Sequence, residues 1–417
     1  MTPVESLSVA EALANILAAV PVLSAERVPF AEAVGRILAE PIVAHDDLPP
    51  FANSSMDGYA LQAADTAAPP TTLRVVGEVA AGAMPQVMVE RGTAVRIMTG
   101  APLPDGADAV VPVEDTDEAW RDKARGLPTH VEIRRTVLAG DFVRPAGGDI
   151  ARGTAVLQPG HRLRPAEISL LASLGQTEVA VVRRPRVGIL ATGDELLEVH
   201  EPLRPGKIRN SNGYAQAAQV AEAGGIPIPL GIGRDTEADV RDRLQAGLEA
   251  GVDLFISSAG VSVGVYDVVT AVLQSAGSIG FWRVRMRPGK PLAFGRYQGI
   301  PYFGFPGNPV SAMVSFERFG RPALLKMGGH TALQRPQLPV TLTVAVDSDG
   351  RESYLRALVQ RTADGGYSAA PTGDQGSHML SSLVTANALL IIPEGVRHAA
   401  VGDVLQALML DWPEWVF

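Results

Sequence analysis

The most constraining feature of this chain is an alternation of strand-like and helix-like segments across residues 185–326. Apolar runs at 186–190, 226–230 and 254–257 alternate with segments that have helical spacing. Strands that alternate with helices predict a parallel sheet covered by helices. In an open α/β sheet, ligands bind at the turns that follow the carboxyl ends of the strands. We therefore expect the functional site in these turns.

Local signals predict where the helices of this segment begin and end. Asn210 is expected to cap a helix that stops at Gly224, and Asp235 or Thr236 to cap one that runs to about residue 250. Asn308, followed by a proline, is typical of a helix start. We also expect a helix over 266–275, a strand over 281–286, and a hairpin of 292–296 with 302–305.

The flanking segments have different patterns. Ser8 and Glu11 form a capping box that predicts a helix up to residue 20, and a second helix is expected over about 30–39. Strands broken by turns are predicted at 73–79, 93–98, 109–113 and 130–134, which suggests a small β-barrel or sandwich, and 165–174 is predicted to be helical. After Gly328, a separate all-β domain is expected from strands at 338–346, 354–361, 389–392 and 404–409.

Length and charge limit the possible classes of protein. A chain of 417 residues predicts two to four domains. The net charge of −9 argues against a nucleic-acid partner, and the absence of cysteine excludes thiol chemistry and disulfides. The sequence shows no signal-peptide pattern and no apolar run of about 18 residues, so we expect a cytoplasmic protein with no membrane partner.

Three turns carry most of the candidate chemistry: 191–196 (ATGDEL), 257–264 (SSAGVSVG) and 287–291 (RPGKP). Arg283, Arg285 and Arg287 alternate along one predicted strand, and Lys290 follows them. Residues that alternate along a strand share a face, so this set could cradle phosphate or an oxyanion. The alternative is a solvated edge strand that is protected by charge.

The other turns also leave alternatives open. The 257–264 turn follows a buried strand and suits either phosphate binding or simple tight packing, and it is neither a P-loop nor a dinucleotide fingerprint. Asp194 and Glu195 could hold Mg²⁺ or orient a water, or could cap a helix. Asp57 and Asp149 lie in glycine-rich turns, where a turn-forming role is the commoner explanation.

Taken together, eight motifs resemble one family, the molybdopterin molybdenumtransferases, the molybdenum insertases to which the E domain of gephyrin also belongs. The motifs occur in the family's order and cover nearly the whole chain. They are residues 56–60 (MDGYA), 98–108 (MTGAPLPDGAD), 148–150 (GDI), 187–196 (VGILATGDEL), 210–213 (NSNG), 261–264 (VSVG), 286–291 (MRPGKP) and 305–311 (FPGNPVS).

The resemblance implies a multi-domain α/β plus β fold in an elongated homodimer. Residues 1–26 and 170–327 would form a molybdopterin-binding α/β/α domain, and 27–50 with 145–169 a linking domain. Residues 51–144 would form a small β-rich domain that reaches toward the partner subunit, and 328–417 a C-terminal β-barrel.

The resemblance also implies a reaction and the residues that serve it. Molybdate, the co-substrate, is inserted into adenylylated molybdopterin with Mg²⁺ as cofactor, AMP is released, and molybdenum cofactor is formed. The molybdopterin adenylyltransferase and cofactor-accepting apoenzymes are the implied protein partners. Matching positions give three groups of candidates. The catalytic candidates are Asp57, Thr99, Asp149, Glu195, Asp235 and Asp267, of which Glu195 and Asp267 are also the metal candidates. The substrate-binding candidates are Thr192, Gly193, Asp194, Ser257, Gly260, Ser262, Gly264, Arg283, Arg287, Gly289, Lys290, Pro306, Gly307, Asn308, Arg356 and Ser377.

This chain departs from the family's usual pattern at three positions. Ala259 stands where the family usually has glycine, Val265 where an acidic residue is frequent, and Arg283 where lysine is common. These departures bear on individual contacts rather than on the resemblance. The competing function is a non-catalytic molybdopterin-binding or scaffold protein of the same fold. The acidic and basic candidates favour the enzyme, because a pure scaffold would not need them.

Overall fold

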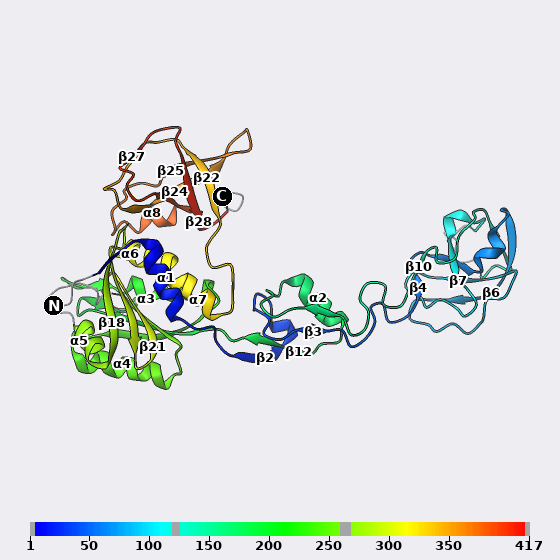
Figure 1. Ribbon diagram of the computed structural model, residues 1–417, viewed down its shortest axis with the longest axis horizontal. Helices are drawn as coiled ribbons and strands as arrows, with labels where there is room; N and C mark the ends of the chain where they lie inside the picture. The colour runs from blue at the N-terminus through cyan, green and yellow to red at the C-terminus, as the bar shows by residue number, and fades with distance from the viewer. Residues whose placement is uncertain (1–4, 119–125, 259–267, 413–417) are drawn as a thin grey trace. The chain divides into compact units, whose positions relative to one another are not determined.

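The computed structural model describes residues 5–118, 126–258 and 268–412. Contacts between residues divide the chain into two compact units (Figure 1). Unit 1 comprises Met1–Arg27, Gly35–Ala39 and Ala180–Phe417, and unit 2 comprises Val28–Val34 and Glu40–Val179. The finer, four-part division of the chain stays a prediction.

Unit 1 contains a seven-stranded sheet in the order β1-β18-β20-β21-β17-β13-β16. Neighbours among β21, β17, β13 and β16 are parallel, whereas β20 is antiparallel to both β18 and β21. The strands are β1 (Glu5–Leu7), β13 (Arg186–Thr192), β16 (Ile226–Gly233), β17 (Leu254–Ser258), β18 (Gly277–Val284), β20 (Pro291–Tyr297) and β21 (Ile300–Phe305). Because β20 is antiparallel to both of these neighbours, β18 runs parallel to β21, and both strands end at the same edge of the sheet.

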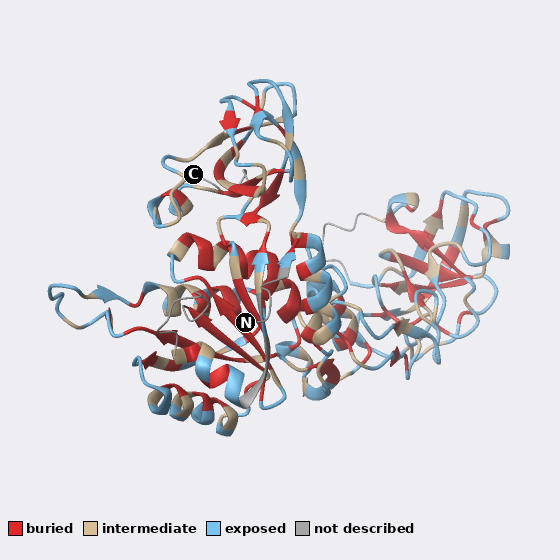
Figure 2. Ribbon diagram, turned by 60° about the vertical axis from the view of Figure 1, so that its left-hand side comes forward, coloured by how far each residue is buried: buried red, intermediate tan, exposed pale blue. Residues whose placement is uncertain are grey.

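Helices cover both faces of this sheet, as the sequence pattern predicts (Figure 1). Ile189 packs in a core with residues of the first helical layer, and the next residue, Leu190, packs in a core with the second layer. This alternation is what a strand buried on both faces requires. Figure 2 shows the central strands buried and the helices exposed on their outer sides. The first layer comprises α1 (Val9–Ala19), α3 (Ser211–Glu222), α6 (Pro309–Ser315), η4 (Phe316–Gly320) and α7 (Arg321–Met327), and the second comprises α4 (Glu237–Glu249) and α5 (Val268–Ala276).

The predicted helix caps are confirmed. The Ser8 hydroxyl accepts from the amide of Glu11, and the Glu11 carboxylate accepts from the amide of Ser8. Asn210 accepts from the third residue of α3, and Thr236 caps α4 in the same way. The predicted hairpin of β20 and β21 is also confirmed. Its turn residues Gln298 and Gly299 have φ of 46° and 85°, as a two-residue turn between twisted strands requires.

The predicted helix over 30–39 is wrong. Only a short 3₁₀ turn, η1 (Phe30–Glu32), forms there, and Gly35 adopts a φ of 79° that ends any helical run. The buried Leu38 then forms a bridge with Val181, and the Ala39 amide donates to the carbonyl of residue 180. Long-range pairing of buried apolar residues therefore overrides the local helical pattern.

Unit 2 contains a five-stranded sheet in the order β8-β5-β7-β6-β9. All four strands predicted in this region are present, and a fifth, β5, lies between β8 and β7 with Tyr59 and Leu61 fully buried. The predicted helix after Pro165 is also present. The elements are β5 (Gly58–Leu61), β6 (Thr71–Val79), β7 (Thr93–Ile97), β8 (Ala109–Pro112), β9 (His130–Ile133), η2 (Ala63–Thr66), η3 (Val113–Asp115) and α2 (Pro165–Ser173). Short pairs are formed by β2 (Ala25–Pro29) with β12 (Glu178–Val182), β3 (Ile42–Val43) with β11 (Ala155–Leu157), and β4 (Asn53–Ser54) with β10 (Val143–Arg144).

The C-terminal part of unit 1 is a small closed barrel, as predicted. Its strands follow the order β24-β25-β22-β28-β26, and β26 pairs back with β24. The strands are β22 (Gln337–Leu342), β24 (Glu352–Arg361), β25 (Tyr367–Pro371), β26 (Ala388–Ile392) and β28 (Val404–Met409). The barrel also carries β23 (Val346–Asp347), β27 (His398–Ala399) and α8 (Ser381–Val384). Across the three described ranges, no helix combines the length and apolar character needed to cross a bilayer.

Candidate functional site

The carboxyl edge of the seven-stranded sheet holds the predicted turns. The connection from β13 through α3 leads to β16 on one side, and the connection from β16 through α4 leads back across to β17 on the other side. The order of strands therefore reverses between β13 and β17, and ligands of open α/β sheets bind at such a reversal. Thr192 at the end of β13 donates from its hydroxyl to the carbonyl of Ser258 at the end of β17, at 3.4 Å.

The turn after β13 brings a glycine and a carboxylate into direct contact. Gly193 has a φ of 139°, and a Cβ built on it would lie 2.3 Å from Oε2 of Glu195. Only glycine fits this backbone without displacing the carboxylate. Asp194 and Glu195 are both exposed, and the short strand β14 (Leu196–Leu197) follows them. No helix begins there, so the helix-cap interpretation of Asp194 and Glu195 is wrong.

The turn after β16 is hydrogen-bonded to the turn after β13. The Asp194 amide donates to the Asp235 carboxylate at 3.3 Å, and the Asp235 amide donates to the Asp194 carboxylate at 3.4 Å. Lys207 donates from Nζ to the Asp194 carbonyl at 2.6 Å. These bonds hold Asp235 close to Asp194, the immediate neighbour of Glu195. Each aspartate still has a carboxylate oxygen that does not take part in these two hydrogen bonds.

These carboxylates fit Mg²⁺, which needs only one or two protein ligands, better than a metal whose ligands all come from the protein. Among the described residues, no group of three or more histidine, aspartate or glutamate side chains has a geometry that could hold a metal. Mg²⁺ is usually held by one or two carboxylates together with substrate phosphates and water. Glu195, with Asp194 or Asp235, could supply such ligands. Asp267, the other predicted metal ligand, lies outside the described residues.

The basic turn at 287–290 lies at the same edge, after β18. Gly289 has a φ of 102°, and a Cβ on it would lie 2.6 Å from the buried Ser315 hydroxyl. The Lys290 carbonyl accepts from the Val284 amide at 2.8 Å, which closes the turn. Arg287 lies on β19 (Met286–Arg287), which pairs in parallel with β24 of the barrel. The barrel therefore helps to fix the position of this turn.

The three alternating arginines have different environments. Arg283 and Arg287 are exposed, as is Lys290. Arg285 instead forms an ion pair with Glu394 and donates to the carbonyl of residue 6. The edge-strand interpretation is wrong, because β1 pairs in parallel with the end of β18 and covers it.

The loop of the barrel that contains Ser377 is hydrogen-bonded to the start of α6. Asn308 donates from its side-chain amide to the Ser377 hydroxyl at 3.1 Å, and the Val310 amide donates to the Ser377 carbonyl at 3.1 Å. On the other side, the Asn212 side chain donates to the Gly307 carbonyl at 2.7 Å. The predicted residues Gly307, Asn308 and Ser377 therefore lie together, and the buried Pro306 precedes them.

Arg356 is almost completely buried, with 1% of its surface exposed. Its guanidinium donates to the Ser382 hydroxyl and to the carbonyls of Asp374 and Gly376, which anchors the loop of Ser377. Burial lowers the pKa of Arg356; the charge of Asp374 opposes this, whereas that of Arg287 adds to it. Arg287 and Arg356 are thus close enough to repel one another, and an anion between them would relieve that repulsion.

Three of the predicted residues, Asp57, Thr99 and Asp149, belong to unit 2. Asp57 and Thr99 are paired in unit 2, where Asp57 Oδ1 accepts from the Thr99 amide at 2.6 Å and from its hydroxyl at 2.8 Å. Asp149 is exposed in another turn of unit 2 and contacts neither of them in the hydrogen bonds of the described residues. Ser257 is fully buried within β17. Gly260, Ser262 and Gly264 lie outside the described residues.

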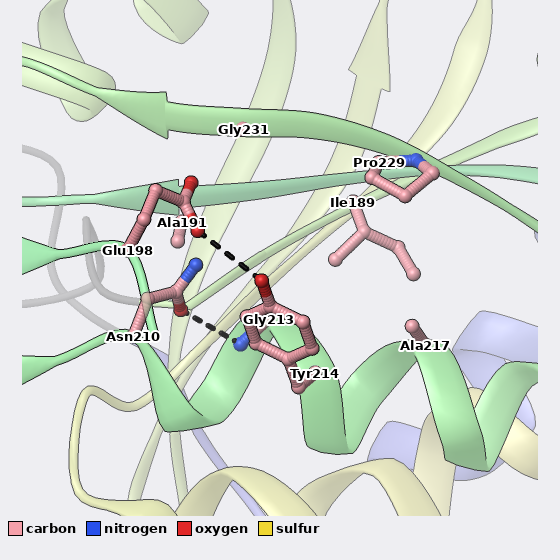
Figure 3. Close-up of a pocket in the computed structure, with 9 residues that line it drawn as sticks. All are labelled: Ile189, Ala191, Glu198, Asn210, Gly213, Tyr214, Ala217, Pro229 and Gly231. Carbon is pink, nitrogen blue, oxygen red and sulfur yellow. Dashed lines mark hydrogen bonds between the residues drawn. The ribbon is translucent and has the colours of Figure 1, made fainter. Parts of the chain in front are cut away.

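The sequence patterns missed Lys207 and a small pocket beside the β13 turn. The pocket, of 160 Å³, lies between α3 and the ends of β13 and β16 (Figure 3). Glu198 and Tyr214 line it, and the Tyr214 hydroxyl donates to the Glu198 carboxylate at 3.3 Å. No motif or regular spacing links these two residues, so only the fold reveals the pair.

The fold and site define a multi-domain α/β protein whose glycine-rich, acidic and basic turns suit a ligand with several anionic groups. Three family descriptions match the chain: "MoeA N-terminal region (domain I and II)" at residues 7–175, "Probable molybdopterin binding domain" at 188–326, and "MoeA C-terminal region (domain IV)" at 339–410. The chain belongs to the MoeA family of molybdopterin molybdenumtransferases, and it is a transferase of molybdenum cofactor biosynthesis.

Individual relatives agree over nearly the whole length. The chain is 40% identical to molybdopterin molybdenumtransferase 2 of Mycobacterium tuberculosis, covering 91% of this chain and 93% of that protein. It is 36% identical to the Bacillus subtilis molybdopterin molybdenumtransferase, covering 93% and 92%. The crystal structure of the molybdopterin biosynthesis MoeA protein from Pyrococcus horikoshii OT3 matches with a TM-score of 0.80 and 30% identity, over 97% of this chain and 100% of that one.

Proposed function

We propose that this chain inserts molybdate into adenylylated molybdopterin, releases AMP and forms molybdenum cofactor. The observation that carries the proposal is that the carboxylate turns and the basic turn lie at the same edge of the sheet. The substrate has a phosphoanhydride bond and molybdate is a dianion, so a site for both needs several cationic and backbone donors. It also needs a group that can hold a metal or a water.

The basic turn supplies the charge that this substrate requires. Arg287 and Lys290 are exposed on either side of the buried Gly289, and Arg283 precedes them on β18. Planar guanidinium groups pair with phosphate through two parallel hydrogen bonds, whereas lysine acts as a compact charge. We assign these three residues to the phosphates and to molybdate. Arg356 and Ser377 complete this side, with Arg356 holding the loop on which Ser377 lies.

The carboxylate turns supply the acid–base and metal groups. Cleavage of the phosphoanhydride bond requires an oxygen nucleophile held in line with that bond, and relief of the charge that develops on the departing AMP. We assign Glu195, next to Asp194, to hold Mg²⁺ or a water, and Asp267 as the second metal ligand. When bound, Mg²⁺ would stabilise negative charge on the phosphate oxygens. Thr192 ends the strand that leads into this turn, and Gly193 is the first residue of the turn.

Resemblance to the family supports the remaining assignments. Asp57, Thr99 and Asp149 of unit 2 are assigned to the active site of the partner subunit in a homodimer. The adenylyltransferase that makes the substrate and the apoenzymes that accept the product are the proposed protein partners, in the cytoplasm. The pairing of Asp57 with Thr99 supports a common role for these two residues.

The decisive experiment follows AMP. The purified protein is incubated with adenylylated molybdopterin and Mg²⁺, with and without molybdate, and AMP is quantified by chromatography. We expect AMP release that depends on molybdate and stops when the metal is chelated. Glu195→Gln should abolish release, whereas Glu249→Gln, which changes an exposed carboxylate at the far end of α4, should not. Release without molybdate, or none with it, would overturn the proposal.

A further inference from the structure

The pocket beside the β13 turn is half open to solvent and is lined largely by small residues. Ala191, Gly213, Ala217 and Gly231 line it, and each has a small side chain or none. Its apolar wall is completed by Ile189 and Pro229 (Figure 3). The pairing of β13 with β16 shifts register beside Ile189, and such bulges redirect strands near functional sites. The space therefore results from a specific local arrangement rather than from loose packing.

The polar groups of the pocket gather at one end. Figure 3 shows the Glu198 carboxylate, the Tyr214 hydroxyl and the Asn210 amide together, away from Ile189 and Pro229. Asn210 Oδ1 accepts from the Gly213 amide at 2.9 Å, which orients the side chain. Tyr214 is half exposed, with 51% of its surface accessible, and its hydroxyl donates to the Glu198 carboxylate at 3.3 Å. Among the described residues, only this hydroxyl donates to the Glu198 carboxylate, which leaves Oε1 and the second lone pair of Oε2 available to a ligand.

The size of the pocket selects one ring of a larger ligand. At 160 Å³ it is smaller than the roughly 300–1,000 Å³ of sites that enclose whole drug-sized molecules. It lies directly after the Gly193–Glu195 turn, because Glu198 follows β14 and the Asn210 amide donates to the Leu197 carbonyl. A ring in this pocket would therefore lie beside the turn that carries Asp194 and Glu195.

The carboxylate distinguishes between the two heterocycles of the proposed substrate. The pyrimidinone edge of a pterin presents a ring N–H beside an exocyclic amino group, and these two parallel donors match the two oxygens of a carboxylate. Adenine presents an amino donor beside a ring nitrogen that accepts, and that nitrogen would face a carboxylate oxygen. An acceptor facing an acceptor is unfavourable, because both groups lose their hydrogen bonds to water.

We propose that this pocket binds the 2-amino-4-oxopyrimidine ring of the substrate's pterin, and that Glu198 recognises its two adjacent N–H donors. The inference rests on the proposed function, since it identifies which end of that substrate lies beside the β13 turn. Glu198 is then a specificity-determining residue, and the small side chains of the pocket make room for the ring.

The test compares pterin with its 2-desamino analogue, which lacks the exocyclic donor. Affinities for these two ligands and for AMP are measured by fluorescence titration and calorimetry with wild-type protein, Glu198→Gln and Glu249→Gln. Loss of a charged hydrogen bond predicts that wild type and Glu249→Gln prefer pterin by about 10-fold or more. Glu198→Gln should lose this preference. A pocket-filling variant, Ala217→Val, should weaken both ligands equally.

Three results would overturn the inference. They are equal binding of the two ligands by wild type (including no detectable binding of either), an unchanged preference in Glu198→Gln, or a loss of AMP affinity in Glu198→Gln with pterin affinity intact. The last result would assign the pocket to adenine instead. None of these results depends on turnover, so molybdate-dependent release of AMP by wild type tests the proposed function separately.

Discussion

A methyl group added at Gly193 should separate the stability of the fold from the position of Glu195. The alanine Cβ would lie 2.3 Å from Oε2 and 2.7 Å from Cδ of Glu195. Ordinary contact begins at 3.4 Å, so the carboxylate must move by about 1 Å, the difference between 3.4 and 2.3. A misplacement of about 1 Å in a catalytic group costs roughly 10²-fold in rate. We therefore expect Gly193→Ala to lower molybdate-dependent AMP release about 100-fold.

The same substitution strains the backbone, and a control must isolate that effect. Alanine at a φ of 139° costs about 1–3 kcal/mol. Gly224, just after α3, has a φ of 84°, and a Cβ there would meet nothing within 4 Å. Gly224→Ala should therefore lose about 1–2 kcal/mol of stability with no change in turnover.

The assay measures stability by denaturant unfolding and single-turnover AMP release for both variants and wild type. Comparable destabilisation, with loss of turnover only in Gly193→Ala, is the expected result. Turnover within about threefold of wild type in a folded Gly193→Ala protein would refute the reasoning. The position of the Glu195 carboxylate would then have no catalytic importance.

Two further predictions concern stability. Arg335→Met should cost about 3–5 kcal/mol in denaturant unfolding, because Glu317, with 7% of its side chain exposed, would keep its charge without its guanidinium partner. Glu222→Gln, which removes the exposed second partner of Arg335, should cost less than about 1 kcal/mol, and equal losses would contradict this explanation. In α2, Arg164 holds the pKa of the buried Glu167 well below its usual 4.5. The stability that Glu167 contributes is therefore fully present above pH 4.5 and is lost as the pH falls toward the folded-state pKa. The unfolding free energies of wild type and Glu167→Gln should differ most at pH 7 and converge in acid, and a constant gap would show that the charge is not responsible.

The sequence predicted the parts of the fold that depend on neighbouring residues. The caps at Asn210 and Thr236 and the turn at Gln298 were predictable, because each is determined within about four residues. The failure over 30–39 has a different origin. There the buried Leu38 pairs with Val181, and no local pattern reveals a partner more than a hundred residues away.

The candidate site shows the same division. The glycine-rich turns after the buried strands were predictable from their order along the chain. Sequence spacing could not show the hydrogen bonds between Asp194 and Asp235 or between Glu198 and Tyr214. These contacts depend on how the strands and helices pack. The ion pair of Arg285 was also not predictable, because its partner Glu394 lies in the barrel, far away in the sequence.

The most direct test is to locate the substrate. Crystals of Glu195→Gln protein, which should bind without turnover, would be soaked with adenylylated molybdopterin and molybdate. We predict difference density for the phosphates between the Gly193 turn and Arg287, with the pterin ring against Glu198. Density for the substrate at any other surface of unit 1, with this edge of the sheet empty, would contradict the assignment of the site.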